Sequence, residues 1–305
     1  QQPVTGRLLV GLRRPAEADL PPQAFLREAL DTLDLSLDAP ALAWGDVANA
    51  GEDSVRLEGL RMTAKATPGI ATVEAEFRLD RFVMHGLNAN GATDVTLAGL
   101  RSGSRQRRGT TTALLVGDAN AELDELHIVG GAGEEPADVK LKGFGLQVQA
   151  AEEGEYLGVR ERFALAALEL AGQMQGRGEL TFVASRLHGP TLMKVQRTSD
   201  EFSAVATGAA PDPAALMSAL MELLPHKPVL AFENVRIEKT GEPLALAARL
   251  AVTLQPPADP AAPDAALQAV NAAQGRFEVP ESFLRLVVAE QVRTMMAFEA
   301  EQADM

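Results

Sequence analysis

The chain has 305 residues and a formal net charge of −14, from 42 acidic and 28 basic side chains. Hydrophobic residues make up 46% and charged residues 23% of the sequence, which is typical of a packed globular chain and not of a disordered one. The acidic balance argues against a nucleic-acid partner, because phosphate binding depends on clustered Lys and Arg.

Cysteine is absent, which excludes disulfides, thiolate nucleophiles and Cys-ligated metal sites. We predict no cofactor. No stretch approaches the ~18 apolar residues that a membrane-spanning helix needs. The chain begins Gln1-Gln2-Pro3 and ends in an acidic turn, which is the wrong charge for a helix C-terminus. We therefore expect the natural chain to extend beyond both ends.

The first elements expected are a strand over residues 4–12 and a helix that starts at Pro21. The helix is predicted because apolar residues recur at helical spacing, namely Phe25, Leu26, Leu30 and Leu33. Residues 1–53 are assigned to this N-terminal strand and helix segment.

From residue 54 to residue 149, apolar and polar side chains alternate, as they do in half-buried strands. One seven-residue pattern occurs three times in this region, at Ser54–Leu60, Asp94–Leu100 and Asp138–Phe144. Its glycine, the sixth residue of each copy, permits a bulge or a bend. The copies lie about 40 residues apart, a spacing typical of stacked supersecondary units. We therefore predict an extended sheet of loose repeats over residues 54–190.

The remaining chain is predicted to continue this sheet and to add helices over residues 191–305. The run 163–170 fits a helix or a strand, and 179–184 fits a strand. A short helix is expected from Gly189, and another over 213–224, because Asp212 is a good N-cap and Pro213 suits the first helical position. We further expect a hairpin of strands, another strand and a final helix, at 229–239 and 244–254, 274–279, and 281–299.

Two sets of residues are candidates for an interaction surface. The basic cluster would contact lipid headgroups or an acidic partner, or else protect an exposed hairpin tip from aggregation. Its members are Arg101, Arg105, Arg107 and Arg108. Methionines on the last two predicted helices would cover a groove or form a dimer contact, or else simply pack on the sheet. They are Met217, Met221, Met295 and Met296.

Motifs for catalysis or metal binding are not found in the sequence. The four histidines are too far apart in sequence for a local zinc site. They are His85, His127, His188 and His226. The acidic alternation from Asp118 to Asp124 lacks the glycine of a calcium loop, so we interpret it as the polar face of a strand. We therefore predict no catalytic residue and no metal ligand.

The order of elements resembles the DUF945 family of YdgA-like bacterial envelope proteins. The resemblance rests on the segments Leu114–Leu126, Leu180–Leu192, Leu216–Pro225 and Thr240–Glu242, and extends from about Trp44 to the end. It implies a periplasmic, β-rich body tethered to the inner membrane by an N-terminal anchor that this chain does not contain. It provides no catalytic motif to transfer.

The fold class expected is α+β, with an extended, curved, mostly antiparallel sheet and amphipathic helices on one face or at its ends. The leading hypothesis is a non-enzymatic periplasmic protein that acts through protein contacts, either with another protein or as a homodimer. The first alternative is a binder or carrier of an apolar ligand such as a lipid chain, which would require a continuous inward row of apolar residues. The second alternative is a hydrolase whose site is assembled from distant Asp, Glu or His residues.

Overall fold

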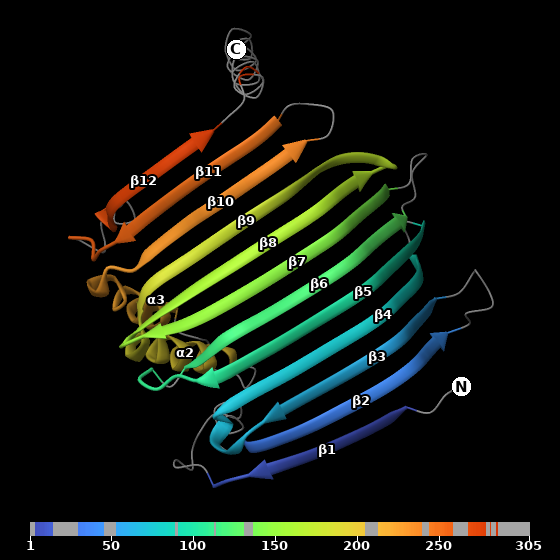
Figure 1. Cartoon of the computed structure of the whole chain (residues 1–305), viewed down its shortest axis with the longest axis horizontal. Helices are drawn as coiled ribbons and strands as arrows, with labels where there is room; N and C mark the ends of the chain where they lie inside the picture. The colour runs from blue at the N-terminus through green and yellow to red at the C-terminus, as the bar shows by residue number, and fades with distance from the viewer. Residues whose placement is uncertain are drawn as a thin grey trace, which may run out of the picture.

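The structure is a computed structural model, which describes residues 4–14, 30–45, 53–88, 91–112, 114–130, 137–204, 213–239, 244–258 and 268–278, together with Glu281 and Arg285. In these residues, twelve strands form one antiparallel sheet, and each strand pairs with the next one along the chain (Figure 1). The strands are β1 (Thr5–Leu12), β2 (Leu30–Gly45), β3 (Ser54–Ala66), β4 (Thr72–Asn88), β5 (Gly91–Arg108), β6 (Leu115–Gly130), β7 (Ala137–Glu153), β8 (Tyr156–Leu170), β9 (Gln173–His188), β10 (Val229–Lys239), β11 (Leu244–Leu254) and β12 (Val270–Glu278).

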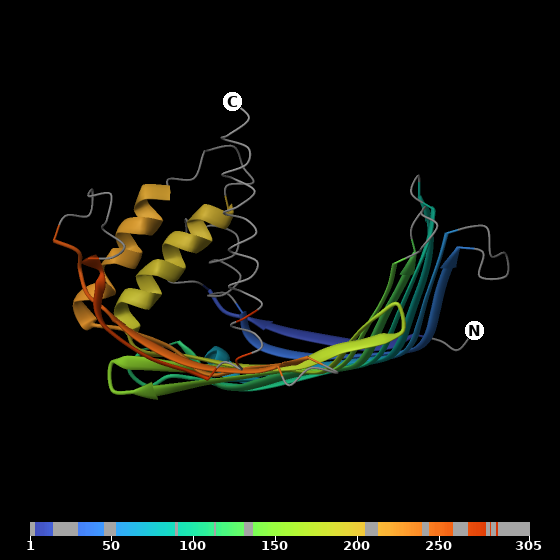
Figure 2. The same cartoon turned by 90° about the horizontal axis from the view of Figure 1, so that it is seen from above.

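The described helices lie between β9 and β10, apart from a single turn of 3-10 helix, η1 (Pro68–Ile70). They are α2 (Gly189–Ala204), α3 (Pro213–Met221) and the short η3 (Leu224–His226). Figure 2 shows α2 and α3 on one side of the sheet, over one end of the strands. The opposite ends of β2 to β9 turn up toward that same side, so the sheet has a concave face and a convex face.

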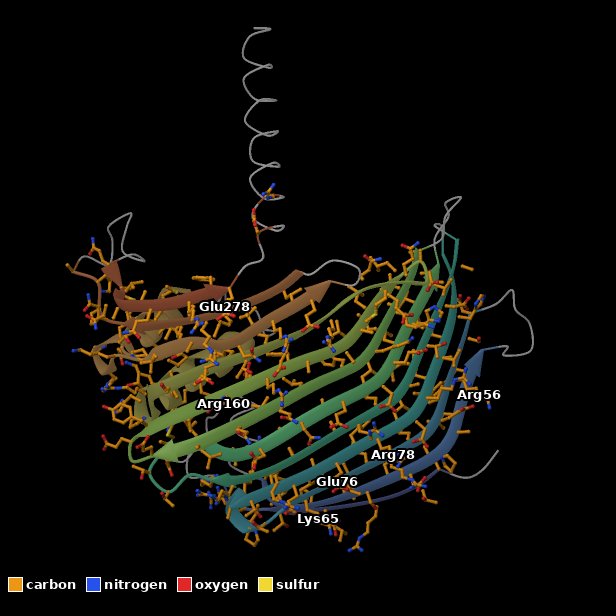
Figure 3. The ribbon with its side chains drawn as sticks, turned by 45° about the horizontal axis from the view of Figure 1, so that its top comes forward. Arg56, Lys65, Glu76, Arg78, Arg160 and Glu278 are labelled. Carbon is orange, nitrogen blue, oxygen red and sulfur yellow. The ribbon has the colours of Figure 1, made fainter. Side chains whose placement is uncertain are left out.

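The two faces differ in polarity. In β4, Val73, Ala75 and Phe77 are half-buried, whereas Glu74 and Glu76 between them are exposed. Residues that are paired across antiparallel strands share a face, so this alternation is propagated through the register from strand to strand. Figure 3 shows the charged face, with Glu76 among the labelled side chains on the side of the sheet turned away from the helices.

The apolar face is the concave one. On β7, Glu152 is paired with the buried Leu157 and alternates with Val148 and Ala150, so it belongs to the apolar face. Its carboxylate accepts a hydrogen bond from the Thr112 N–H at 2.6 Å. Thr112 in turn lies against Gly189, the first residue of α2. The helices therefore rise from the apolar face.

A row of glycines and aspartates accounts for the bend in the strands. Gly59, Gly99 and Gly143 have φ of +66°, +67° and +60°, a conformation that other residues rarely adopt. Asp80 and Asp124, on the neighbouring strands, lie against Gly59 and Gly99. A left-handed residue at the same level of β3, β5 and β7 therefore changes the strand direction along one line across the sheet.

The predicted elements are confirmed for the most part, with two differences. Residues 163–170, which fitted a helix or a strand, are strand. The short helix from Gly189 extends to Ala204. Leu30 and Leu33, predicted on a helix, lie in β2, where Leu33, Leu35 and Leu37 alternate. Alternation over Leu33, Leu35, Leu37 and Ala39 outweighs a helical spacing that only a few residues fit. Phe25 and Leu26 fall outside the described residues, as does the helix predicted over 281–299 apart from two helical residues, Glu281 and Arg285.

Candidate functional site

The concave face carries apolar rows that cross the whole sheet. The pairing of successive strands aligns one row of ten residues from β2 to β11, all of them apolar except one serine. This first row consists of Leu37, Met62, Phe77, Ser102, Ala121, Leu146, Phe163, Leu180, Val235 and Ala248. It starts beside Gly6 of β1 and ends beside Phe277 of β12.

A second row runs parallel to the first, two residues closer to the helices. It consists of Leu35, Ala64, Ala75, Ser104, Ala119, Val148, Glu161, Phe182, Phe232 and Leu250. Phe182 and Phe232 contact each other, with ring centroids 5.4 Å apart. Glu161 is the one charged residue in either row.

No residue of the two rows is fully buried. Most are half-buried, and Phe232 keeps 40% of its surface exposed. Nine steps of about 4.8 Å between strands make each row roughly 43 Å long from β2 to β11. The concave face is thus a long apolar surface that stays accessible to solvent. Its area is far larger than that of the apolar patches on an ordinary protein surface.

The basic cluster lies on strand β5, with Arg107 and Arg108 at its end, next to the connection to β6. Arg101 donates a hydrogen bond to Asp124 at 2.6 Å, and Arg105 donates one to Glu74 at 3.0 Å. Arg107 and Arg108 have no acidic partner within 4.0 Å among the residues described. Two of the four arginines therefore form cross-strand ion pairs on the convex face, and the cluster does not contribute to the apolar rows.

The methionines are only partly described. Met217 lies on α3 with 57% of its surface exposed, and Met221 ends the same helix and is half-buried. Met295 and Met296 fall outside the described residues. Lys194 of α2 forms an ion pair with Glu222, just after α3, and so ties the two helices together.

Glu152 fixes the connection between β5 and β6 at the helix end of the concave face. One carboxylate oxygen accepts the N–H groups of Thr111 and Thr112 at 2.9 and 2.6 Å, and the other accepts the N–H and O–H of Thr110. Hydrogen bonds from Thr112 first, and from Thr110 and Thr111 after it, lower the pKa of Glu152 to about 2. The folded structure therefore favours the ionised form of the Glu152 carboxylate.

Replacing Glu152 with glutamine is expected to destabilise the protein in a pH-dependent way. The pKa in the folded state lies below the ordinary value of 4.5, so the stabilisation is present above that pH and is lost as the pH falls toward about 2. Thermal unfolding of both proteins over this pH range should show the difference in Tm shrinking as the pH falls. Glu153→Gln, at the exposed neighbouring position, is the control and should show no such difference. A constant difference in Tm for Glu152→Gln would contradict this role.

Two histidines stack where the helices join the sheet. The rings of His188 and His226 lie 3.8 Å apart at an angle of 12°, and Tyr156 lies beside both. His188 also contacts the hydroxyl of Thr191 at 2.8 Å. Burial, followed by the charge of His188, lowers the pKa of His226. The contact between η3 and the end of β9 therefore favours the neutral form of His226.

We expect this contact to weaken in mild acid. The lowered pKa means that the unfolded chain binds the proton first, so stability falls as the pH drops below the ordinary value of 6.5. The substitution His226→Phe keeps an aromatic ring at this position but removes the group that binds a proton. Comparing Tm at about pH 7.5 and about pH 5.5 should show a smaller acid-induced decrease for His226→Phe than for the original protein. An equal or larger decrease for the variant would contradict this interpretation.

The other sequence-predicted polar residues belong to the sheet itself. His85 pairs with Asp94 at 2.6 Å and His127 with Asp138 at 2.7 Å, each across neighbouring strands. The acidic alternation on β6 is the polar side of a strand, as predicted. Among the described residues, no group of three His, Asp or Glu side chains is arranged to hold a metal ion, and no helix is long and apolar enough to cross a membrane.

Residues 29–305 match the family described as bacterial protein of unknown function (DUF945). The match covers most of the chain, so the chain belongs to this family, and the resemblance inferred from the sequence is confirmed. β1 precedes the matched range. No curated protein and no solved structure matches the chain.

Proposed function

We propose that the protein binds an apolar chain, such as the acyl chain of a lipid, along the concave face of the sheet, and that it does so without catalysis. The observation that supports this proposal is the pair of apolar rows that cross the sheet while remaining accessible. The surface of a soluble protein rarely exposes a contiguous apolar area of this size unless a ligand or a partner covers it.

The shape of the surface favours a long and flexible ligand. The rows run across the strands, between the helices on one side and the upturned strand ends on the other (Figure 2). An alkyl chain laid along a row would remove its own methylenes and the exposed Leu, Phe and Val side chains from water. Each buried methylene contributes about 0.8 kcal/mol, so a chain of ordinary lipid length gains ample free energy.

The helices and the repeat fit into this proposal. We infer that α2 and α3 pack along one side of the ligand and close that side of the concave face. The three copies of the sequence pattern lie on β3, β5 and β7, so each repeat corresponds to a two-stranded unit. Adding such units would lengthen the apolar rows without changing their cross-section. The proposed location is the periplasm, with tethering to the inner membrane, as the family resemblance implies.

A second candidate function is protein contact through the edge strand β1. Leu8, Leu9, Val10 and Leu12 of this strand are all exposed, between 47 and 70%. Arg7 is the one charged residue of β1, so the strand lacks the charges and prolines that usually protect a sheet edge from pairing. A partner strand could add to this edge and extend the sheet.

Native mass spectrometry of the purified chain, followed by organic extraction and lipid analysis, tests the main proposal. We expect a near-stoichiometric lipid adduct that organic extraction releases. A chain that carries no adduct, even after incubation with lipid vesicles, would contradict lipid binding. A larger assembly without lipid would instead favour the contact through β1.

A further inference from the structure

One carboxylate lies among the apolar side chains of the concave face. Glu161 lies in the middle of the second row, on β8, and is half-buried. Its neighbours along the strand on this face are Val159 and Phe163, and the residues paired with it on β7 and β9 are Val148 and Phe182. Every immediate neighbour of this side chain on the concave face is therefore apolar.

Glu161 has no ionic or hydrogen-bonding partner in the described part of the chain. The adjacent arginines point to the convex face, where Arg160 pairs with Glu233 at 2.7 Å and Arg162 pairs with Glu179 at 2.8 Å. Glutamates elsewhere on β8 and β9 do have cationic partners, as Glu169 does with Lys142 at 2.7 Å. A half-buried carboxylate among apolar side chains loses part of its hydration without gaining a partner, which is unfavourable in free energy.

We propose that Glu161 binds the polar end of the ligand, and that the ligand is an amphiphile with a protonated amine next to its apolar chain. This inference rests on the proposed function and specifies its ligand class. An ammonium group would supply the missing partner through a charge-assisted hydrogen bond, while the chain lies along the rows on either side. The net charge of −14 further disfavours an amphiphile with an anionic end.

Displacement of a fluorescent fatty-chain probe from the full chain tests this inference. Hexadecylamine, hexadecanol and hexadecanoic acid share one chain length and differ only in the polar end. We expect the amine to bind roughly tenfold more tightly than the alcohol, and the acid to bind more weakly than either. In Glu161→Gln, the preference for the amine should disappear while binding of the alcohol is retained.

Glu76→Gln is the matched control, because Glu76 is an exposed carboxylate on the convex face (Figure 3). This variant should keep the preference for the amine. The same preference in Glu161→Gln as in the original protein would overturn the role of Glu161 and leave the proposed function intact. Failure of every amphiphile to displace the probe, or of the probe to bind at all, would overturn the proposed function itself. If amine-specific binding is confirmed, vesicles that contain ethanolamine phospholipid, compared with vesicles that contain choline phospholipid, will show whether a lipid headgroup can supply the amine.

Discussion

Replacing Gly99 with alanine is expected to destabilise the protein by about 2–3 kcal/mol. Gly99 has a φ of +67°, which costs an L-residue with a side chain about 1–2 kcal/mol. The added Cβ would lie 1.9 Å from the Oδ2 atom of Asp124, closer than any real contact. Asp124 cannot move without cost, because Arg101 donates a hydrogen bond to its carboxylate at 2.6 Å. Chemical denaturation followed by circular dichroism measures the loss.

Gly145→Ala is the matched control for this prediction. Gly145 lies in β7 outside the left-handed region, and a Cβ there would meet nothing within 4 Å. This variant should change stability by less than about 0.5 kcal/mol or stabilise the protein slightly. Adding Asp124→Ala to Gly99→Ala should restore part of the lost stability, because it removes the clash and leaves the backbone strain. Equal stabilities for Gly99→Ala and Gly145→Ala would contradict the account of the bend.

Replacing Leu146 with glutamate is expected to weaken binding of an apolar chain by at least about tenfold. Leu146 lies in the middle of the first row, paired with Ala121 and Phe163. A carboxylate at this position would have to lose hydration against the chain, and a tenfold change corresponds to only about 1.4 kcal/mol. Displacement of a fluorescent fatty-chain probe measures the change in Kd.

The matched control is Gln147→Glu, which places the same charge one residue along β7. Gln147 is exposed on the convex face, so its carboxylate would stay in water and leave binding unchanged. Circular dichroism should show that both variants keep the strand content of the original protein. Equal loss of binding in the two variants would mean that the ligand does not use the concave face.

The sequence predicted the individual strands better than their alignment with one another in the sheet. The alternation of apolar and polar residues from β3 to β7 is a local signal, because each strand has one apolar face and one face exposed to water. Each copy of the pattern ends near a glycine, which indicated a bend, but the strands continue beyond Gly59, Gly99 and Gly143. The alignment of these glycines in one row depends on the register of twelve strands, which no local pattern specifies.

The candidate site was predicted less completely. The sequence singled out Arg101, Arg105, Met217 and Met221 because charged clusters and methionines are visible without the fold. The apolar rows appear only when residues from β2 to β11 are aligned by pairing. Glu161 was missed, although its alternation with Val159 and Phe163 placed it in the apolar phase of β8, which is the signal that would have found it.

Photo-crosslinking with a fatty acyl probe that carries a diazirine in its chain tests the central claim most directly. After irradiation and digestion, peptide mass spectrometry locates the modified residues. We predict modification of residues in the two apolar rows, such as Leu146, Phe163 and Phe182, and competition by unlabelled amphiphile. Modification confined to convex-face residues such as Gln147 and Arg162, or none at all, would contradict binding along the concave face.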